Sequence, residues 1–370
     1  MNYIITGSGY VSELSKAEST NTKVITEQEF KTSEITLNKY DKVYSPTESA
    51  LEIILERSQD TTFKNAVVAL KDKSEFRELM SNLYPDFFYQ KIDLIDLETA
   101  ELDRTKSYII KPNKGFFGTA VKTLKPKTDL TATVSDMKAE LETNKKYFSD
   151  SILSADEMII EQLAVGEEYA VDMYFDDIGE PVILNIYHHP VPEKQEYFHV
   201  LYYTNRKLFH KFYDALVNIF KDLNTHLKVR NFPIHAEFIE EDSVLVPIEM
   251  NPLRYGGFGL ADLTLYAFGI NPFQAFFENF KPDWVQIHNK NQDRNFGWVL
   301  GYNGTNIDVN SKIPNHVKYK NYLGNVLHYV ETDYQNLPVF SVSYVEDDSA
   351  GSLKRLLKTE FNEFFTEKTN

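Results

Sequence analysis

Two hairpin-like segments on either side of one long helical segment constrain the fold of this chain most strongly. Residues 167–190, "EEYAVDMYFDDIGEPVILNIYHHP", contain two apolar runs joined by a short turn, which predicts a β-hairpin. The segments "PIHAEFIE" and "VLVPIEM" flank an acidic turn at 240–242 and predict a second hairpin. Between the hairpins, over about 206–227, apolar residues recur at helical spacing. We therefore expect a large antiparallel sheet and a long amphipathic helix.

The N-terminal part has the pattern of a parallel α/β unit. Residues 3–6 form an apolar run that ends in a Gly-Ser-Gly loop, and "KNAVVAL" at 64–70 reads as another buried strand. The full glycine fingerprint of a dinucleotide site is missing, so that function is disfavoured. An amphipathic helix is expected from Lys73 to Leu83, where Pro85 ends it.

A small independent lobe is predicted over about 104–163. The segment "SYIIKPNKGFFGTAVKTL" at 107–124 reads as strand, glycine turn and strand. A helix over about 129–148 and a strand at 157–163 would complete the lobe. Strand-like segments and a closing amphipathic helix follow residue 281. The predicted domains are 1–95 (N-terminal α/β), 96–280 (containing the small lobe) and 281–370 (C-terminal lobe of unknown role).

Composition excludes several classes of function. A chain of 370 residues with 42% apolar residues is long enough for more than one core. Its net charge of -16 makes a nucleic-acid footprint improbable, because phosphate binding needs a basic surface. Without cysteine there is no disulfide, thiol nucleophile or zinc–thiolate site. No signal-peptide or membrane-spanning pattern is present, so we expect a soluble, cytoplasmic protein.

Three oxygen-bearing side chains are expected to meet on the second hairpin. Residues two apart on a strand face the same side, so Glu249 and Asn251 converge, and Glu237 of the partner strand lies alongside. Two carboxylates and an amide oxygen form the hard donor set that Mg²⁺ or Mn²⁺ prefers. The alternative is a solvated hairpin face. A cation and flexible backbone that follow at once, Arg254 with Gly256 and Gly257, favour the metal site.

Two further segments fit a nucleotide. Lys111 ends an apolar strand, and the glycine turn that follows could cover phosphates, although such a turn is also typical of a plain hairpin. The strand end at 161–163 offers acceptors beside an apolar wall, which suits an adenine ring. Glu168, seven residues beyond Glu161, could accept hydrogen bonds from ribose hydroxyls. A water-exposed acidic hairpin end is the alternative for this segment.

In this order, from about Lys71 to Ala275, these segments resemble the ATP-grasp superfamily of ligases, which includes biotin carboxylase, D-alanine:D-alanine ligase and L-amino acid ligases. The resemblance implies an α/β (α+β) ATP-grasp fold with an N-terminal parallel-sheet domain, a small lid lobe and a larger antiparallel lobe. One departure is Leu253, which separates the "NP" of the motif from Arg254. The implied residues are Lys73, Lys111, Lys114, Gly115, Phe117, Gly118, Glu161, Gln162, Leu163, Glu168 and Asn251 for ATP; Glu237, Glu249 and Asn251 for Mg²⁺ or Mn²⁺; and Arg254 and Lys111 for catalysis.

The resemblance also implies a reaction. A small-molecule carboxylate would be activated by ATP as an acyl phosphate and joined to an amine, without nucleic acid or membrane partners and with a homodimer as one possibility. His188, His235, Arg254, Gly256 and Gly257 are expected to face the substrate, although each histidine alone is more often an ordinary hydrogen-bonded residue. The alternatives are an ATP-grasp kinase that phosphorylates a hydroxyl, and a nucleotide-binding module without turnover.

Overall fold

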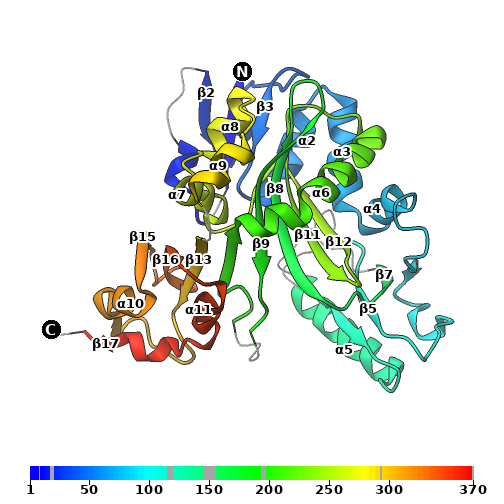
Figure 1. Cartoon of the computed structure of the whole chain (residues 1–370). Coiled ribbons are helices and arrows are strands. Elements are labelled where there is room, and N and C mark those ends of the chain that lie inside the picture. Colours follow the sequence, from blue (N-terminus) through cyan, green and yellow to red (C-terminus); the bar gives the residue numbers. More distant parts are fainter. Residues whose placement is uncertain are drawn as a thin grey trace.

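An eight-stranded antiparallel sheet forms the centre of the protein (Figure 1). The computed structural model describes residues 1–7, 9–16, 21–114, 120–145, 156–192, 197–291 and 294–368. In the sheet the strands lie in the order β12-β11-β8-β9-β10-β13-β16-β15. They are β8 (Glu167–Phe175), β9 (Pro181–His189), β10 (Leu201–Asn205), β11 (Phe232–Glu241), β12 (Val244–Pro252), β13 (Asn295–Tyr302), β15 (Asn325–Glu331) and β16 (Val339–Asp347).

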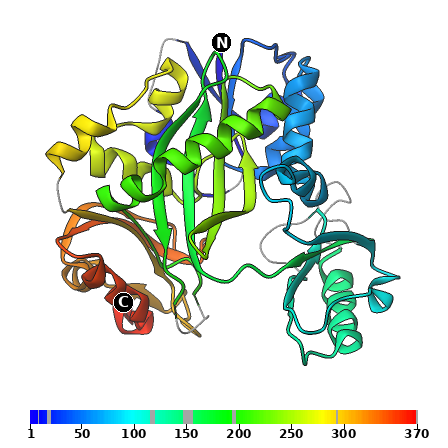
Figure 2. The same cartoon turned by 45° about the vertical axis from the view of Figure 1, so that its right-hand side comes forward.

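Both predicted hairpins and the long helix are confirmed. β8 and β9 pair across a turn in which Asp176 Oδ1 accepts hydrogen bonds from the N–H groups of Ile178 and Glu180. The helix α6 (Arg206–Leu227) begins where Asn205 Oδ1 accepts from the N–H of Leu208. Figure 2 shows α6 lying across one face of the sheet. The side chains of the candidate site, described below, lie on the opposite face.

The N-terminal unit is a three-stranded parallel sheet with helices, but one predicted strand is wrong. The sheet order is β2-β1-β3. Residues 64–70 are helical, because Asp60 caps the segment through the N–H groups of Thr62 and Phe63 and because three apolar residues form one buried stripe. The elements are β1 (Asn2–Thr6), β2 (Thr22–Thr26), β3 (Lys42–Tyr44), α1 (Glu27–Thr32), α2 (Leu51–Arg57), α3 (Thr61–Lys71) and α4 (Lys73–Met80).

The small lobe has its own antiparallel sheet and its own core. The strand order is β4-β7-β5-β6, and the buried side chains of Val134, Met137 and Leu141 pack against it from α5. β4 precedes the predicted range of 104–163, so this sheet also takes in residues that we assigned to the N-terminal domain. The elements are β4 (Tyr89–Asp93), β5 (Tyr108–Pro112), β6 (Lys122–Leu124), β7 (Glu157–Gln162) and α5 (Leu130–Lys145).

The strands of the C-terminal segment extend the central sheet, since β13 pairs with β10. The closing helix is shorter than predicted, because α11 ends at Lys354 and short 3-10 turns follow. No helix in the described ranges is long and apolar enough to cross a bilayer. The remaining elements are α7 (Leu263–Phe268), α8 (Pro272–Glu278), α9 (Trp284–Lys290), α10 (His316–Leu323), α11 (Ala350–Lys354), β14 (Lys312–Pro314) and β17 (Phe365–Glu367).

Candidate nucleotide and metal site

The three predicted metal ligands lie together on β11 and β12. Glu237 is directly opposite Glu249 in the register, and Asn251 follows on the same face two residues further along. The pairing shifts just beyond Glu237, next to Pro247, which has no N–H to donate to the sheet. The bulge therefore falls at the point where the chain must present Glu249.

His235 and Asp172 lie on the same face of the sheet as this set of ligands, and His235 contacts the set. His235 Nδ1 lies 2.8 Å from Asp172 Oδ1, and its Nε2 lies 3.5 Å from Glu237 Oε1. Burial disfavours the imidazolium, but the hydrogen bonds and charges of Asp172 and Glu237 outweigh burial and raise the pKa of His235 to about 9. Burial would also raise the pKa of Glu237, yet His235 holds that pKa well below its usual range. The protonated ring thus orients the carboxylate of Glu237.

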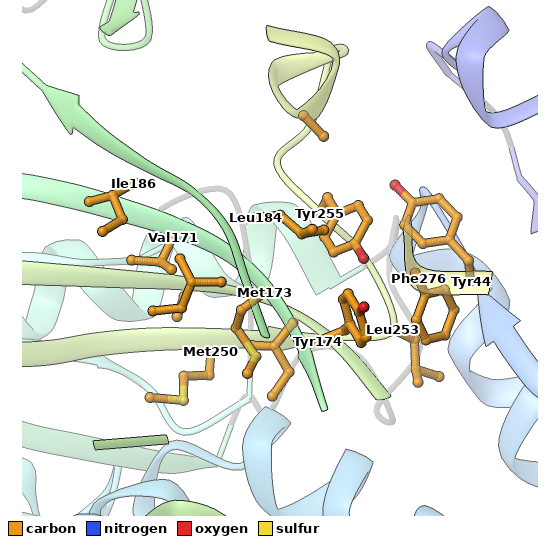
Figure 3. Packing of buried hydrophobic residues seen from close by; sticks show 14 of the residues in the cluster. Tyr44, Val171, Met173, Tyr174, Leu184, Ile186, Met250, Leu253, Tyr255 and Phe276 are labelled. Carbon is orange, nitrogen blue, oxygen red and sulfur yellow. The ribbon is translucent and has the colours of Figure 1, made fainter. Parts of the chain in front are cut away.

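The loop after Asn251 brings Arg254 back to the site. Leu253, the extra residue of the motif, has a left-handed backbone with φ of 64° and a fully buried side chain, visible in the core in Figure 3. Its N–H donates to Pro233 O at 2.8 Å and its carbonyl accepts from Ser45 N at 2.7 Å, which fixes the turn. Arg254 follows, and its charge contributes to the low pKa of Glu237. Despite the extra residue, Arg254 therefore still lies close to the proposed metal ligands.

The two glycines after Arg254 differ in their surroundings. The N–H of Gly256 donates to Asp172 Oδ1 at 2.9 Å, and a Cβ there would lie 2.6 Å from Leu260 Cδ2. A Cβ at Gly257 would meet no atom within 4 Å, so space is open beside it. Gly256 is therefore required by packing, whereas Gly257 borders free space near the site.

A network around Glu48, which the sequence did not reveal, joins the N-terminal unit to this loop. Glu48 Oε1 lies 3.1 Å from Arg254 Nη2, and Glu48 Oε2 lies 2.8 Å from Lys71 Nζ. Lys71 Nζ also lies 3.3 Å from Asn251 Oδ1. Glu48 and Lys71 belong to no motif, so only their position in the fold identifies them.

The two predicted phosphate lysines approach each other where α4 meets β5. Asn113, at the end of β5, accepts from the N–H of Ser74 through Oδ1 and donates to Asp72 Oδ2 through Nδ2. This contact sets Lys73 near Lys111. Burial lowers the pKa of Lys73 to about 8, with Glu249 opposing the shift and Lys111 adding to it. Lys111 of the small lobe and Glu249 of the metal set thus both lie near Lys73.

In the segment predicted for adenine, several polar groups already bind other groups of the protein. The carboxylate of Glu161 is buried between Lys111 Nζ at 2.7 Å and Arg77 Nε at 2.8 Å, so the side chain holds cations. The N–H groups of Gln162 and Leu163 donate to the carbonyls of Phe88 and Ser107. An adenine contact at these residues would therefore need carbonyl groups or an exchange of these bonds.

The ribose residue and the first substrate histidine lie on opposite faces of the sheet. Glu168 is on the face of Glu237, where its Oε1 lies 2.7 Å from His189 Nδ1. His188 is on the α6 face: it pairs with Glu167 at 2.6 Å and stacks on Tyr169. His188 is thus not brought to the metal set, because alternate residues of a strand face opposite ways. Its neighbour His189 is, and it stacks on Tyr202 with ring centroids 4.0 Å apart.

The rest of the predicted phosphate loop is only partly described. Lys114 is half-buried at the end of the described β5 segment. Gly115, Phe117 and Gly118 lie outside the described residues. A cavity of about 880 Å³ is found elsewhere, between the starts of α6 and α11, and contains none of the predicted site residues.

The donor set fits a hard divalent cation that shares its coordination with a ligand. Within the described ranges, no group of three or more His, Asp and Glu side chains is arranged to hold a metal. The set here has two carboxylates and the oxygen of a buried amide, Asn251, which is 1% exposed. Such a set is incomplete alone and suits Mg²⁺ or Mn²⁺ completed by phosphate and water oxygens.

Comparisons with known proteins find a matching domain model and solved structures of similar fold. A family model of the ATP-grasp domain matches residues 105–262. No similar sequence was found among the curated proteins. The crystal structure of an L-amino acid ligase from Bacillus licheniformis is similar over 100% of this chain and 98% of its own, with a TM-score of 0.67 and 14% identity.

Two other solved structures share the fold. An N5-carboxyaminoimidazole ribonucleotide synthetase from Thermotoga maritima is similar over 100% of both chains, with a TM-score of 0.63 and 13% identity. A biotin carboxylase from Campylobacter jejuni is similar over 87% of this chain and 73% of its own, with a TM-score of 0.58 and 12% identity. The α/β fold and the resemblance to ATP-grasp ligases expected from the sequence are confirmed: residues 105–262 match the ATP-grasp domain model, and the chain shares its fold with these structures.

Proposed function

We propose that this protein is an ATP-dependent ligase that activates a small-molecule carboxylate and joins it to an amine. One observation carries the proposal: Glu237, Glu249 and Asn251 share one face, with Arg254 close enough to act on the charge of Glu237 and with Lys73 near both Glu249 and Lys111. Three oxygen donors beside several cations suit a nucleotide triphosphate with its metal. The names of the structural relatives, a ligase, a synthetase and a carboxylase, support this class of reaction.

The proposed reaction has two steps. An oxygen of the carboxylate attacks the γ-phosphorus of ATP, and the bond to ADP breaks. The amine nitrogen then attacks the acyl carbon, the bond from that carbon to the phosphate oxygen breaks with its electrons going to phosphate, and the nitrogen releases a proton to the departing phosphate or to water. Neither step needs a protein nucleophile, which is consistent with a chain without cysteine.

In this reaction the residues of the protein would bind the nucleotide and neutralise the negative charge of its phosphates. Lys73 and Lys111 would contact the phosphates, and Arg254 would face the charge that develops on the transferred group. The pKa of Lys73, lowered by burial to about 8, leaves this lysine largely protonated at neutral pH. Glu237, Glu249 and Asn251 would hold Mg²⁺ or Mn²⁺, which supplies further neutralisation of the phosphate oxygens. The homodimer and the cytoplasmic location stay predictions.

The test is a product assay with a matched control. Purified protein with MgATP and a library of carboxylates and amines is expected to release ADP and phosphate together with a new amide, identified by mass spectrometry. Glu249→Gln should lower turnover on the order of 100-fold or more, because the metal loses one negatively charged ligand. Glu180→Gln, which changes a carboxylate at an exposed ion pair with Lys221, should leave turnover unchanged.

Each other outcome has a definite meaning. A phosphorylated hydroxyl product without free phosphate would identify a kinase. Nucleotide binding without turnover for any acceptor would identify a binding module. Full activity of the Glu249→Gln variant would contradict the metal assignment itself.

A further inference from the structure

Lys71 ends α3 with its ammonium group beside the proposed metal ligands. Its Nζ lies 3.3 Å from Asn251 Oδ1, the amide oxygen that we assign to the metal. The Lys71 side chain is 24% exposed and Asn251 is 1% exposed, so water screens this contact only weakly. An ammonium group therefore already occupies one of the three oxygen donors.

Glu48 holds this ammonium in place. Its Oε2 lies 2.8 Å from Lys71 Nζ, and its Oε1 lies 3.1 Å from Arg254 Nη2. Burial would raise the pKa of Glu48, but Lys71 and Arg254 outweigh burial and lower it. The carboxylate is thus charged and bridges two cations. Lys71 keeps a partner even when it leaves Asn251.

The orientation of the Asn251 amide depends on the same contact. Its Nδ2 is buried and has no hydrogen-bond partner among the described residues, whereas its Oδ1 accepts from Lys71. The reverse orientation would set an NH₂ group against an ammonium group, which is repulsive. Lys71 therefore holds the oxygen in the direction that a cation requires.

We propose that Lys71 is an internal competitor for the divalent metal: in the nucleotide-free protein it occupies Asn251 Oδ1, and metal binding displaces it. The inference rests on the proposed function, which assigns Asn251 to the metal. A dication and an ammonium group repel each other when both approach one oxygen, so the two occupants exclude each other. After displacement Lys71 stays on Glu48, which also holds Arg254.

The test is a double-mutant cycle on Mn²⁺ affinity, measured by electron paramagnetic resonance on nucleotide-free protein. Lys71→Met should bind Mn²⁺ about tenfold tighter than wild type, because the competing charged hydrogen bond is removed. Part of any gain could come from net charge alone. In the Asn251→Ala background the contact is already absent, so Lys71→Met should there give a much smaller gain.

Two results would overturn the inference. One is an equal gain in both backgrounds, which would show an effect of net charge only. The other is unchanged or weaker Mn²⁺ binding by Lys71→Met. If Asn251→Ala does not fold, Asn251→Ser replaces it in the cycle. If wild-type protein binds Mn²⁺ and ADP but the double-mutant cycle gives one of these two results, only this inference is contradicted. If wild-type protein does not bind Mn²⁺ with ADP at all, the proposed function is contradicted.

Discussion

Glu161 places a buried negative charge between two buried cations, and its role follows from that position. The side-chain exposures are 2% for Glu161, 3% for Arg77 and 8% for Lys111. Burial alone would raise the pKa of Glu161, but Lys111 and Arg77 outweigh it and lower that pKa to about 2. Arg77 Nη1 also donates to Pro247 O at 2.6 Å, so the group links β7 of the small lobe to β12 of the central sheet.

Glu161→Gln is expected to destabilise the protein strongly. The substitution keeps the size of the side chain but leaves Lys111 and Arg77 as buried cations without a countercharge, which typically costs about 3–5 kcal/mol. The free energy of unfolding, from urea titration followed by circular dichroism, measures the loss.

Glu157→Gln in the same strand is the matched control. Its partner Lys91 is 43% exposed and Glu157 is 39% exposed, so an effect of about 0–1 kcal/mol is expected. Equal losses in the two variants would show that the buried pairs at Glu161 contribute no more than a surface ion pair.

Single residues also show what the sequence could not supply. The spacing of Glu237, Glu249 and Asn251 revealed a shared face, because hairpin register follows from strand alternation. His188 was assigned to the substrate although the same alternation turns it toward α6 and turns His189 toward the metal set. Glu48 and Lys71 were out of reach, since contacts between residues 180 or more positions apart depend on the whole fold.

At the scale of elements, the error at α3 has a clear cause. A short run of β-branched and apolar residues fits a buried strand and a buried helix face equally well. The local signal that decides for a helix is the N-cap at Asp60, which lies before the apolar run and not within it. The helix α6 was predicted with its true bounds because its apolar stripe is long enough to exclude a strand.

A loop of the N-terminal unit, a 3-10 turn and β16 meet at a buried carboxylate, Asp262 of the turn Leu260–Asp262. Ser12 Oγ, in the N-terminal unit, donates to Asp262 Oδ2 at 2.6 Å, and Tyr344 OH, on β16, lies 3.3 Å from the same oxygen. Asp262 Oδ1 has no partner among the described residues. Burial raises the pKa of Asp262 to about 7, against these two hydrogen bonds.

The raised pKa predicts a pH-dependent loss of stability. The folded state keeps the proton up to about pH 7, while the unfolded chain loses it near pH 4, so this stabilisation is complete below pH 4 and is lost as pH rises through 7. A shift of that size corresponds to on the order of 4 kcal/mol. Other carboxylates have the opposite dependence, so the wild type must be compared with Asp262→Asn.

The comparison is made by urea unfolding at several pH values. Relative to wild type, Asp262→Asn should gain stability steadily between about pH 4 and pH 7 and should then stay constant. A difference between the two proteins that is the same at pH 4 and pH 8 would show that Asp262 does not titrate in this range.

At the scale of the whole molecule, the site lies between bodies with separate cores. The buried residues of the small lobe, including Leu141, form one cluster, and those of the central sheet with α6, including Leu216, form another. Polar links cross between the bodies, such as Arg77 on α4 to Glu161 on β7 and Asn113, after β5, to Asp72, before α4. The existence of the small lobe was predicted from the sequence, but its extent was not, because β4 carries no strong apolar pattern.

Separate cores predict separate local stability. Leu141→Ala should open a cavity in the small lobe at a cost of about 2–5 kcal/mol, and amide hydrogen exchange should accelerate in β5, β7 and α5 but not in α6. Leu216→Ala, a truncation of the same size in α6, should give faster exchange in the central body. Faster amide exchange in both bodies of the Leu141→Ala variant would show one cooperative unit.

The same variant tests how the small lobe contributes to nucleotide binding. Lys111 belongs to the small lobe and Lys73 to α4, so a lobe that opens by itself would move one proposed phosphate contact while the other stays. Leu141→Ala should therefore also weaken ATP binding without changing Mn²⁺ binding.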